Sequence, residues 1–278
     1  MHRRSLRLGL LTVLGLARKG YFIPYRHADK LPRPGAVPRY RAIAATMDQA
    51  APQFAALLDR VDELADDLMA IGDAPPPAPR WGQDWFPTLD AAAAYTIVRS
   101  RRPARIFEVG SGHSTRFMKR AVDDSGHACR ILAIDPMPKR GVDRLDIEIR
   151  AQTLNAIDLA LFDELQAGDI LFIDSSHILM PGSDVDDLVN RVLPALPPGI
   201  LVHVHDIFLP DDYPEVWDWR GYNEQSIIAA LVGSGAYNVL FASHYVETRM
   251  AERLAASVIA RLPAKPDSYP ASLWLEKR

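Results

Sequence analysis

The feature that most restricts the fold of this chain is an alternation of short apolar runs with amphipathic stretches from residue 104 onward. The runs are continuously apolar, which is typical of strands buried on both faces of a sheet. Helical spacing marks most of the stretches between them, and strand–helix alternation predicts a parallel, doubly wound α/β sheet. We predict strands over residues 104–109, 130–135, 147–152, 169–174, 199–206, 237–242 and 272–276, and helices over 114–122, 154–165, 183–196, 223–233 and 245–261.

A helical segment and a proline-rich stretch precede this pattern. Pro52 suits the first turn of a helix, and apolar residues from Phe54 to Leu68 recur at helical spacing, so we predict a helix over 52–71. The stretch Asp73–Pro79 holds four prolines, which lack the backbone donor that a helix or a central strand needs. The chain is therefore divided into an N-terminal helical segment (1–72), a stiff linker (73–80) and a main domain (81–278).

Charge is distributed unevenly along the chain. Residues 1–35 carry eight Lys and Arg against one Asp, or +7, so the remainder carries −10 within a net charge of −3. A pI near 6.2 argues against nucleic acid as a partner, because nucleic-acid-binding domains are basic. The single cysteine, Cys129, excludes an internal disulfide.

The basic N-terminus surrounds an apolar run, Leu8–Ala17, which is shorter than the roughly 18 residues of a membrane span. Three interpretations stay open: a signal peptide, an amphipathic helix packed on the body, and a basic helix resting on an anionic membrane surface. We expect a cytoplasmic protein in which residues 1–35 can contact a membrane peripherally.

A glycine turn follows the first predicted strand. Gly110 and Gly112 allow a tight turn and a close approach of the backbone to a ligand, and a helix follows. Asp135 ends the next strand, where a carboxylate can accept hydrogen bonds from ribose hydroxyls. A dinucleotide fingerprint would place its third glycine at Thr115, and Glu108 would repel a pyrophosphate. S-adenosylmethionine instead brings an ammonium and a sulfonium group, so the charges favour this methyl donor over a nicotinamide dinucleotide.

Several motifs resemble those of the class I S-adenosylmethionine-dependent methyltransferases, in particular the bacterial enzymes that methylate sugars and other small molecules. These motifs are Phe107-Glu-Val-Gly-Ser-Gly-His-Ser-Thr115, Ala133-Ile-Asp-Pro136, Gly168-Asp-Ile-Leu-Phe-Ile-Asp-Ser-Ser-His177, Val202-His-Val-His-Asp-Ile-Phe-Leu-Pro210 and Asn223-Glu-Gln225. The resemblance covers about residues 81–277 and implies a seven-stranded, mostly parallel Rossmann-like sheet whose last strand is antiparallel. It implies a donor site lined by Glu108, Gly110, Ser111, Gly112, His113, Asp135 and Asp174, with Gln152 near the adenine.

A second group of polar residues ends two other predicted strands: Asp174 and His177 after one, and His205 and Asp206 after the other. Ligands of open α/β sheets bind at the carboxyl ends of the strands, so both pairs should face the donor site. Methyl transfer to a hydroxyl needs a base, and a histidine can serve near neutral pH. A divalent metal such as Mg²⁺ or Mn²⁺ could act instead by lowering the pKa of the hydroxyl.

The resemblance implies roles for these residues. In similar sugar O-methyltransferases a metal-binding aspartate is followed three residues later by a catalytic histidine, a spacing that Asp174 and His177 share. The carboxylate expected before Asp206 is His205 here, which departs from the metal pattern. The predicted catalytic residues are His177, Asp206 and His205, and the metal candidates are Asp174 and Asp206. The competing interpretations are structural: a hydrogen-bonded His177, a buried His205 and a loop-capping Asp206.

Residues 207–222 form a long connection rich in aromatic residues, which we interpret as a lid over a small-molecule acceptor. Asn223, Glu224 and Gln225 either contact the acceptor or cap the following helix. The sequence predicts a methyltransferase acting on the hydroxyl of a sugar or another small molecule. Two alternatives remain: a nicotinamide-dependent oxidoreductase, and a non-catalytic module that binds S-adenosylmethionine.

Overall fold

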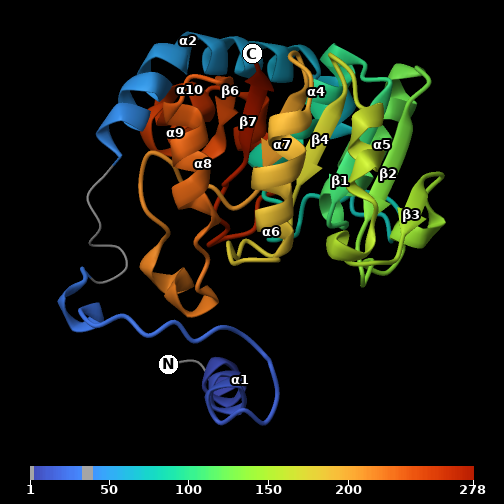
Figure 1. Ribbon diagram of the computed structural model, residues 1–278. Coiled ribbons are helices and arrows are strands. Elements are labelled where there is room, and N and C mark those ends of the chain that lie inside the picture. The colour runs from blue at the N-terminus through green and yellow to red at the C-terminus, as the bar shows by residue number, and fades with distance from the viewer. Residues whose placement is uncertain (1–2, 33–39) are drawn as a thin grey trace. The chain divides into compact units, whose positions relative to one another are not determined.

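The computed structural model describes residues 3–32 and 40–278, and the chain divides into two compact units (Figure 1). The larger unit comprises Tyr40–Pro210 and Asn223–Arg278, and the smaller one Met1–Arg39 together with Asp211–Tyr222. The smaller unit contains helix α1 (Arg3–Val13) and two 3-10 helices, η1 (Ala28–Lys30) and η6 (Glu215–Arg220). The division of the chain into a helical segment (1–72), a linker (73–80) and a main domain (81–278) stays a prediction.

A seven-stranded sheet forms the centre of the larger unit, in the order β3-β2-β1-β4-β5-β7-β6. Only β7 runs antiparallel to its neighbours, and the other pairs are parallel. This confirms the predicted doubly wound sheet and its antiparallel last strand. The strands are β1 (Arg105–Val109), β2 (Arg130–Ile134), β3 (Glu148–Arg150), β4 (Ile170–Ile173), β5 (Leu201–Val204), β6 (Tyr237–Ala242) and β7 (Leu273–Lys277).

Helices cover both faces of this sheet; in Figure 1, α6 and α7 lie in front of it and α4 lies behind it. The α-helices are α2 (Arg41–Glu63), α3 (Ala65–Met69), α4 (Thr88–Arg101), α5 (His113–Ser125), α6 (Asp184–Asp187), α7 (Leu193–Ala195), α8 (Glu224–Gly233), α9 (Ser243–Arg249) and α10 (Ala251–Ala255). Short 3-10 helices are η2 (Val142–Arg144), η3 (Leu154–Ala156), η4 (Leu159–Glu164) and η7 (Val258–Arg261), and a π-helical turn, η5 (Leu188–Val192), joins α6 to α7.

Three of the predicted helices differ from those observed. The stretch 154–165 forms η3 and η4, the stretch 183–196 contains the π-helical turn, and the stretch 245–261 is divided among α9, α10 and η7. Helix α4 was not predicted at all. Its residues Thr88–Val98 are all buried, so it has no polar face along this stretch to produce an amphipathic pattern.

The predicted helix over 52–71 begins too late. Helix α2 starts at Arg41 and continues through Pro52 to Glu63. An internal proline removes one hydrogen bond and costs about 3 kcal/mol. Helix α2 tolerates it because one buried apolar stripe, which contacts β6 and α4, runs along both sides of the proline. The stripe comprises Ile43, Met47, Ala50, Phe54, Leu58 and Val61.

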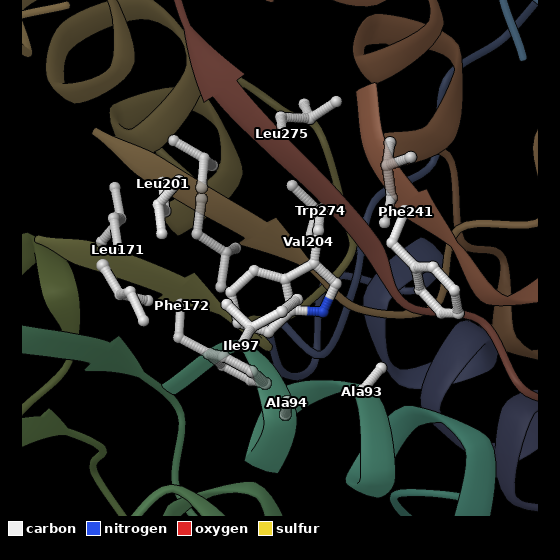
Figure 2. Packing of buried hydrophobic residues seen from close by; sticks show 14 of the residues in the cluster. Ala93, Ala94, Ile97, Leu171, Phe172, Leu201, Val204, Phe241, Trp274 and Leu275 are labelled. Atoms are coloured by element: carbon white, nitrogen blue, oxygen red, sulfur yellow. The ribbon is translucent and has the colours of Figure 1, made fainter. Parts of the chain in front are cut away.

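Aromatic packing fills the core between the centre of the sheet and α4. Figure 2 shows Trp274 of β7 and Phe172 of β4 close to Ala93 and Ala94 of α4. The Phe172 ring also stacks on His203 of β5, with ring centroids 3.6 Å apart. Burial holds the pKa of His203 well below 6.5, and its Nε2 lies 2.8 Å from the Ser272 hydroxyl. His203 is therefore a neutral core residue, whereas His205, two residues later, lies beyond the end of β5.

Candidate active site

The polar residues chosen from the sequence gather at one edge of the sheet. Strands β1, β2, β4 and β5 are mutually parallel, so their carboxyl ends meet at this edge, where ligands of open α/β sheets bind. The loops that follow these strands carry the glycine turn, Asp135, the pair Asp174 and His177, and the pair His205 and Asp206. The polar residues form two clusters, a glycine-loop cluster around Glu108 and an imidazole cluster around His177.

Gly110 of the glycine-loop cluster packs closely against the backbone of Asp174 in the imidazole cluster. Its φ of +94° lies in the left-handed region, and a Cβ at this position would lie 2.2 Å from the carbonyl oxygen of Asp174. The sequence suggested that this glycine makes room for a ligand. The structure shows that the room is occupied by the protein's own β4 loop. Any side chain at position 110 would displace that loop.

The carboxyl group of Glu108 fixes the first turn of α5 to β1. It is fully buried and accepts hydrogen bonds from the hydroxyls of Ser114 (2.5 Å) and Thr115 (2.6 Å), two partners that the sequence analysis did not identify. Burial raises the pKa of Glu108 to about 8, although both hydroxyls act to lower it. At neutral pH the Glu108 carboxyl group is therefore mostly protonated. A protonated Glu108 would not repel a pyrophosphate, so its charge speaks less strongly against a dinucleotide than the sequence indicated.

The other donor-site candidates lie around the same turn. Asp135 is half-buried and accepts hydrogen bonds from the Ser111 hydroxyl (2.7 Å) and the Met137 amide (2.7 Å). His113 is the first residue of α5, and burial together with the charge of Arg116 lowers its pKa to about 4. Gln152 is exposed just after β3. All of these residues lie at the carboxyl edge of the sheet, and their contact with the methyl donor stays a prediction.

His177 lies at the centre of the imidazole cluster. Its ring is buried, with Nδ1 2.9 Å from Glu224 Oε2 and Nε2 3.3 Å from Asp174 Oδ1 and 3.5 Å from Asp206 Oδ2. Burial alone would lower the pKa of His177, but the hydrogen bonds to Asp174 and Glu224 outweigh it and raise the pKa well above 6.5. A buried imidazole held by carboxylates on both nitrogens has a fixed orientation and is a strong proton acceptor once neutral.

The backbone at this cluster is strained. His177 has a φ of +60° and Asp206 a φ of +57°, both in the left-handed region that non-glycine residues seldom adopt. Such strain costs on the order of 1–3 kcal/mol per residue and is concentrated at functional sites. The two strained residues also contact each other, with His177 Nε2 3.5 Å from Asp206 Oδ2. Two of the three residues predicted as catalytic, His177 and Asp206, therefore adopt this strained conformation, and His205 does not.

His205 is buried, as the structural interpretation expected, but it also contacts the cluster. Its Nε2 lies 3.2 Å from the carbonyl oxygen of Trp85 and 3.5 Å from Asp206 Oδ1. Burial would lower the pKa of His205, but Asp206 and Asp174 act in the opposite direction and raise it. His205 therefore supports Asp206 from the side away from His177.

The start of α8 supplies a residue whose role the sequence left undefined. Glu224 is buried and contacts His177, and its neighbours fix the surrounding loops. Gln225 accepts a hydrogen bond from the Phe208 amide (2.6 Å), and the Asn223 side chain accepts one from the Leu179 amide (2.7 Å). The motif Asn223-Glu-Gln225 was the available signal, but only the structure shows which catalytic candidate it contacts.

The arrangement does not fit the metal site considered above. The imidazole nitrogen of His177 lies between Asp174 and Asp206, and the second oxygen of Asp206 faces His205. Within residues 3–32 and 40–278, no group of three or more His, Cys, Asp and Glu side chains is arranged to hold a metal ion. The position that a cation would need between the two carboxylates is taken by an imidazole.

Comparison with known proteins finds a methyltransferase domain in part of the chain. Residues 107–207, which contain both clusters except Glu224, match the family model described as a methyltransferase domain. The seven strands and the antiparallel β7 are those that the resemblance to class I methyltransferases implied. Residues 107–207 therefore form a methyltransferase domain, which agrees with the class I S-adenosylmethionine-dependent methyltransferase predicted from the sequence. No curated protein matches the chain.

Solved structures with a related fold include methyltransferases bound to S-adenosylhomocysteine (SAH). One from Podospora anserina is 14% identical over 93% of this chain and 99% of its own, with a TM-score of 0.43. An O-methyltransferase from Bacillus cereus is 13% identical over 87% and 93%, with a TM-score of 0.40. A branched-chain polyamine synthase from Thermus thermophilus is 16% identical over 77% and 63%, with a TM-score of 0.45. These scores are too low to add to the assignment, which depends on the family match.

Two predictions from the sequence, the lid and the membrane contact, concern parts of the smaller unit. The segment interpreted as a lid contains η6. The guanidinium carbon of Arg220 lies 4.2 Å from the centre of a Trp217 ring and 5.4 Å from the centre of the Tyr222 ring. Whether it covers the acceptor stays a prediction. None of the helices in the described ranges is both long and apolar enough to cross a membrane.

Proposed function

We propose that this enzyme transfers the methyl group of S-adenosylmethionine to a hydroxyl of a small molecule, such as a sugar, with His177 as the general base. The single observation that supports this most strongly is the environment of His177. The imidazole is buried beside the carboxyl ends of β4 and β5, with Glu224 at one nitrogen and Asp174 and Asp206 at the other. A methyltransferase acting on a more acidic or already deprotonated acceptor would not need such a base.

The proposed donor site is the glycine-loop cluster. Asp135 follows β2 with two oxygens that already accept hydrogen bonds, and a carboxylate can accept further bonds from two ribose hydroxyls. Gly110, Ser111, Gly112 and His113 would surround the methionine part, and Gln152 the adenine. Glu108 holds the turn in place from behind rather than contacting the ligand through free oxygens.

In the proposed reaction, S-adenosylmethionine supplies an electrophilic methyl group whose leaving group is the neutral thioether SAH. The acceptor oxygen forms the new O–CH₃ bond as the S–CH₃ bond breaks, and the hydroxyl proton passes to Nε2 of His177. The imidazolium so formed lies between Asp174 and Asp206, whose negative charges stabilise it. Glu224 fixes the tautomer by accepting the hydrogen bond from Nδ1.

The proposal is tested with purified protein and isotopically labelled S-adenosylmethionine against hydroxyl acceptors, including glycosides, nucleotide sugars and catechols. Transfer of label to an acceptor oxygen, with loss of transfer in His177→Ala, supports the proposal. Donor binding without transfer to any hydroxyl, while an amine or thiol acceptor becomes labelled, would overturn O-methylation. Activity that disappears with chelator and returns with Mg²⁺ would show that a cation, rather than His177, activates the acceptor.

A further inference from the structure

The smaller unit exposes an unusual concentration of apolar side chains. Ten of the sixteen exposed large hydrophobic residues in the described part of the chain lie between residues 6 and 31. We call this set the N-terminal patch: Leu6, Leu10, Val13, Leu14, Leu16, Tyr21, Phe22, Ile23, Tyr25 and Leu31. Apolar side chains exposed in such number along one short segment are typical of a surface that meets a partner or a membrane.

Helix α1 shows how the patch is built. None of its residues is buried, and Leu6, Leu10 and Val13, which are 43%, 52% and 60% exposed, recur at helical spacing on one face. Arg3, Arg4 and Arg7 are exposed on the same helix. An apolar stripe beside arginines is typical of helices that lie in the plane of a membrane interface.

The residues after α1 repeat this combination without a helix. Tyr21, Phe22, Ile23 and Tyr25 are exposed, and the Arg18 guanidinium lies 5.7 Å from the centre of the Tyr21 ring. Aromatic residues and cationic side chains together favour the headgroup region of a bilayer. The described residues 3–32 therefore combine exposed apolar side chains with exposed cationic ones.

Charge identifies the partner. Residues 3–32 contain seven Lys and Arg, all exposed, against a single acidic residue, Asp29. A second copy of this segment would bring like charges together, which is unfavourable. An anionic bilayer attracts each cation near its surface by about 1 kcal/mol and accepts the apolar side chains as well. Anionic lipids are concentrated in the cytoplasmic leaflet, which agrees with the location expected from the sequence.

We propose that the N-terminal patch docks this enzyme on an anionic membrane surface, with α1 and residues 14–31 lying in the interface. Docking does not depend on the reaction proposed for the larger unit. It would carry with it Asp211–Tyr222, which belongs to the same compact unit and directly connects the β5 loop to α8.

The test is co-sedimentation of the full chain with vesicles of phosphatidylcholine alone or with about 30 mol% phosphatidylserine, in about 0.1 M and about 0.5 M salt. The expected result is binding to the anionic vesicles at low salt, with at least about tenfold weaker partitioning at high salt. Equal binding to both vesicle types, or binding to neither, overturns the proposal.

Paired variants locate the surface. Leu6→Asp with Leu10→Asp, and separately Arg3→Glu with Arg7→Glu, should each reduce partitioning at least about tenfold. Met69→Asp and Arg261→Glu are the matched controls, because both residues are exposed in the larger unit, and they should bind as the wild type does. A Leu6/Leu10 variant that binds vesicles normally but changes from dimer to monomer in light scattering would show that the stripe instead covers a second copy.

Discussion

The two polar clusters at the edge of the sheet satisfy their buried carboxyl groups in opposite ways. In the glycine-loop cluster, Glu108 receives two hydroxyl donors from the helix that begins only a few residues later, and its pKa rises to about 8. In the imidazole cluster, Asp174, Asp206 and Glu224 surround His177, whose pKa is raised well above 6.5. In the first cluster burial favours the protonated form of Glu108, and in the second the three carboxyl groups favour the charged form of the imidazole that they surround.

The largest effect is expected from removing the imidazole. His177→Ala should slow the chemical step about 10²–10⁴-fold, the usual contribution of a general base, because no other group would take the hydroxyl proton. Single-turnover kinetics measures this step, and calorimetry should show nearly unchanged donor affinity. If the variant binds the donor far more weakly at an unchanged chemical rate, His177 belongs to the donor site and the division into two clusters fails.

The complementary change in the other cluster is Asp135→Ala. It should weaken S-adenosylmethionine binding by about 1.5–3 kcal/mol, the scale of charge-assisted hydrogen bonds, with a smaller effect on the rate at saturating donor. Calorimetry checks the affinity, with Asp163→Ala, an exposed acid on η4, as the control. Wild-type affinity in Asp135→Ala would contradict the assignment of Asp135 to the ribose.

A smaller effect is expected at Glu224. If His177 must be neutral to act, activity rises with pH through the pKa of His177, which lies above 6.5. Glu224→Gln removes one negative partner, so this pKa should fall by about one unit and the rate limb should move to lower pH, with a rate plateau reduced about tenfold. The pH profile of kcat/KM measures both. Glu252→Gln, an exposed acid on α10, should leave the profile in place.

The last variant tests the protonation of Glu108 in the glycine-loop cluster, and it does so through stability rather than activity. Because the folded-state pKa of Glu108 is about 8, above its ordinary value of 4.5, the folded protein holds a proton that the unfolded chain loses. The stabilising contribution is largest below the unfolded value and disappears as the pH rises through about 8. The Tm of Glu108→Gln minus that of the wild type should therefore increase between about pH 5 and pH 9. Each kcal/mol by which the free energy of unfolding of the wild type falls should change this difference by about 2–4 °C. A flat difference would mean that Glu108 is ionised and that the two clusters do not differ in charge.

How much the sequence could predict differs between these clusters for a physical reason. The glycine turn, Asp135 and the strand ends were predictable because strand, turn and helix follow one another within a short stretch of chain. Glu224 was not, since its contact with His177 joins residues 47 positions apart. The full extent of α2 was hidden by Pro52, whose usual effect on helices is outweighed here by packing against β6. Helix α4 was hidden because burial on all sides removes periodicity.

The contact between Gly110 and the carbonyl of Asp174 has a consequence for attempts to change the acceptor. A change of acceptor by exchange of one loop requires that the donor loop keeps its structure. In this protein the two loops interlock through their backbones, so a grafted replacement for residues 174–177 must reproduce the course of that carbonyl. A graft that moves the Asp174 carbonyl would also change the turn at Gly110. Such a graft would then weaken binding of the methyl donor while it changes the acceptor specificity.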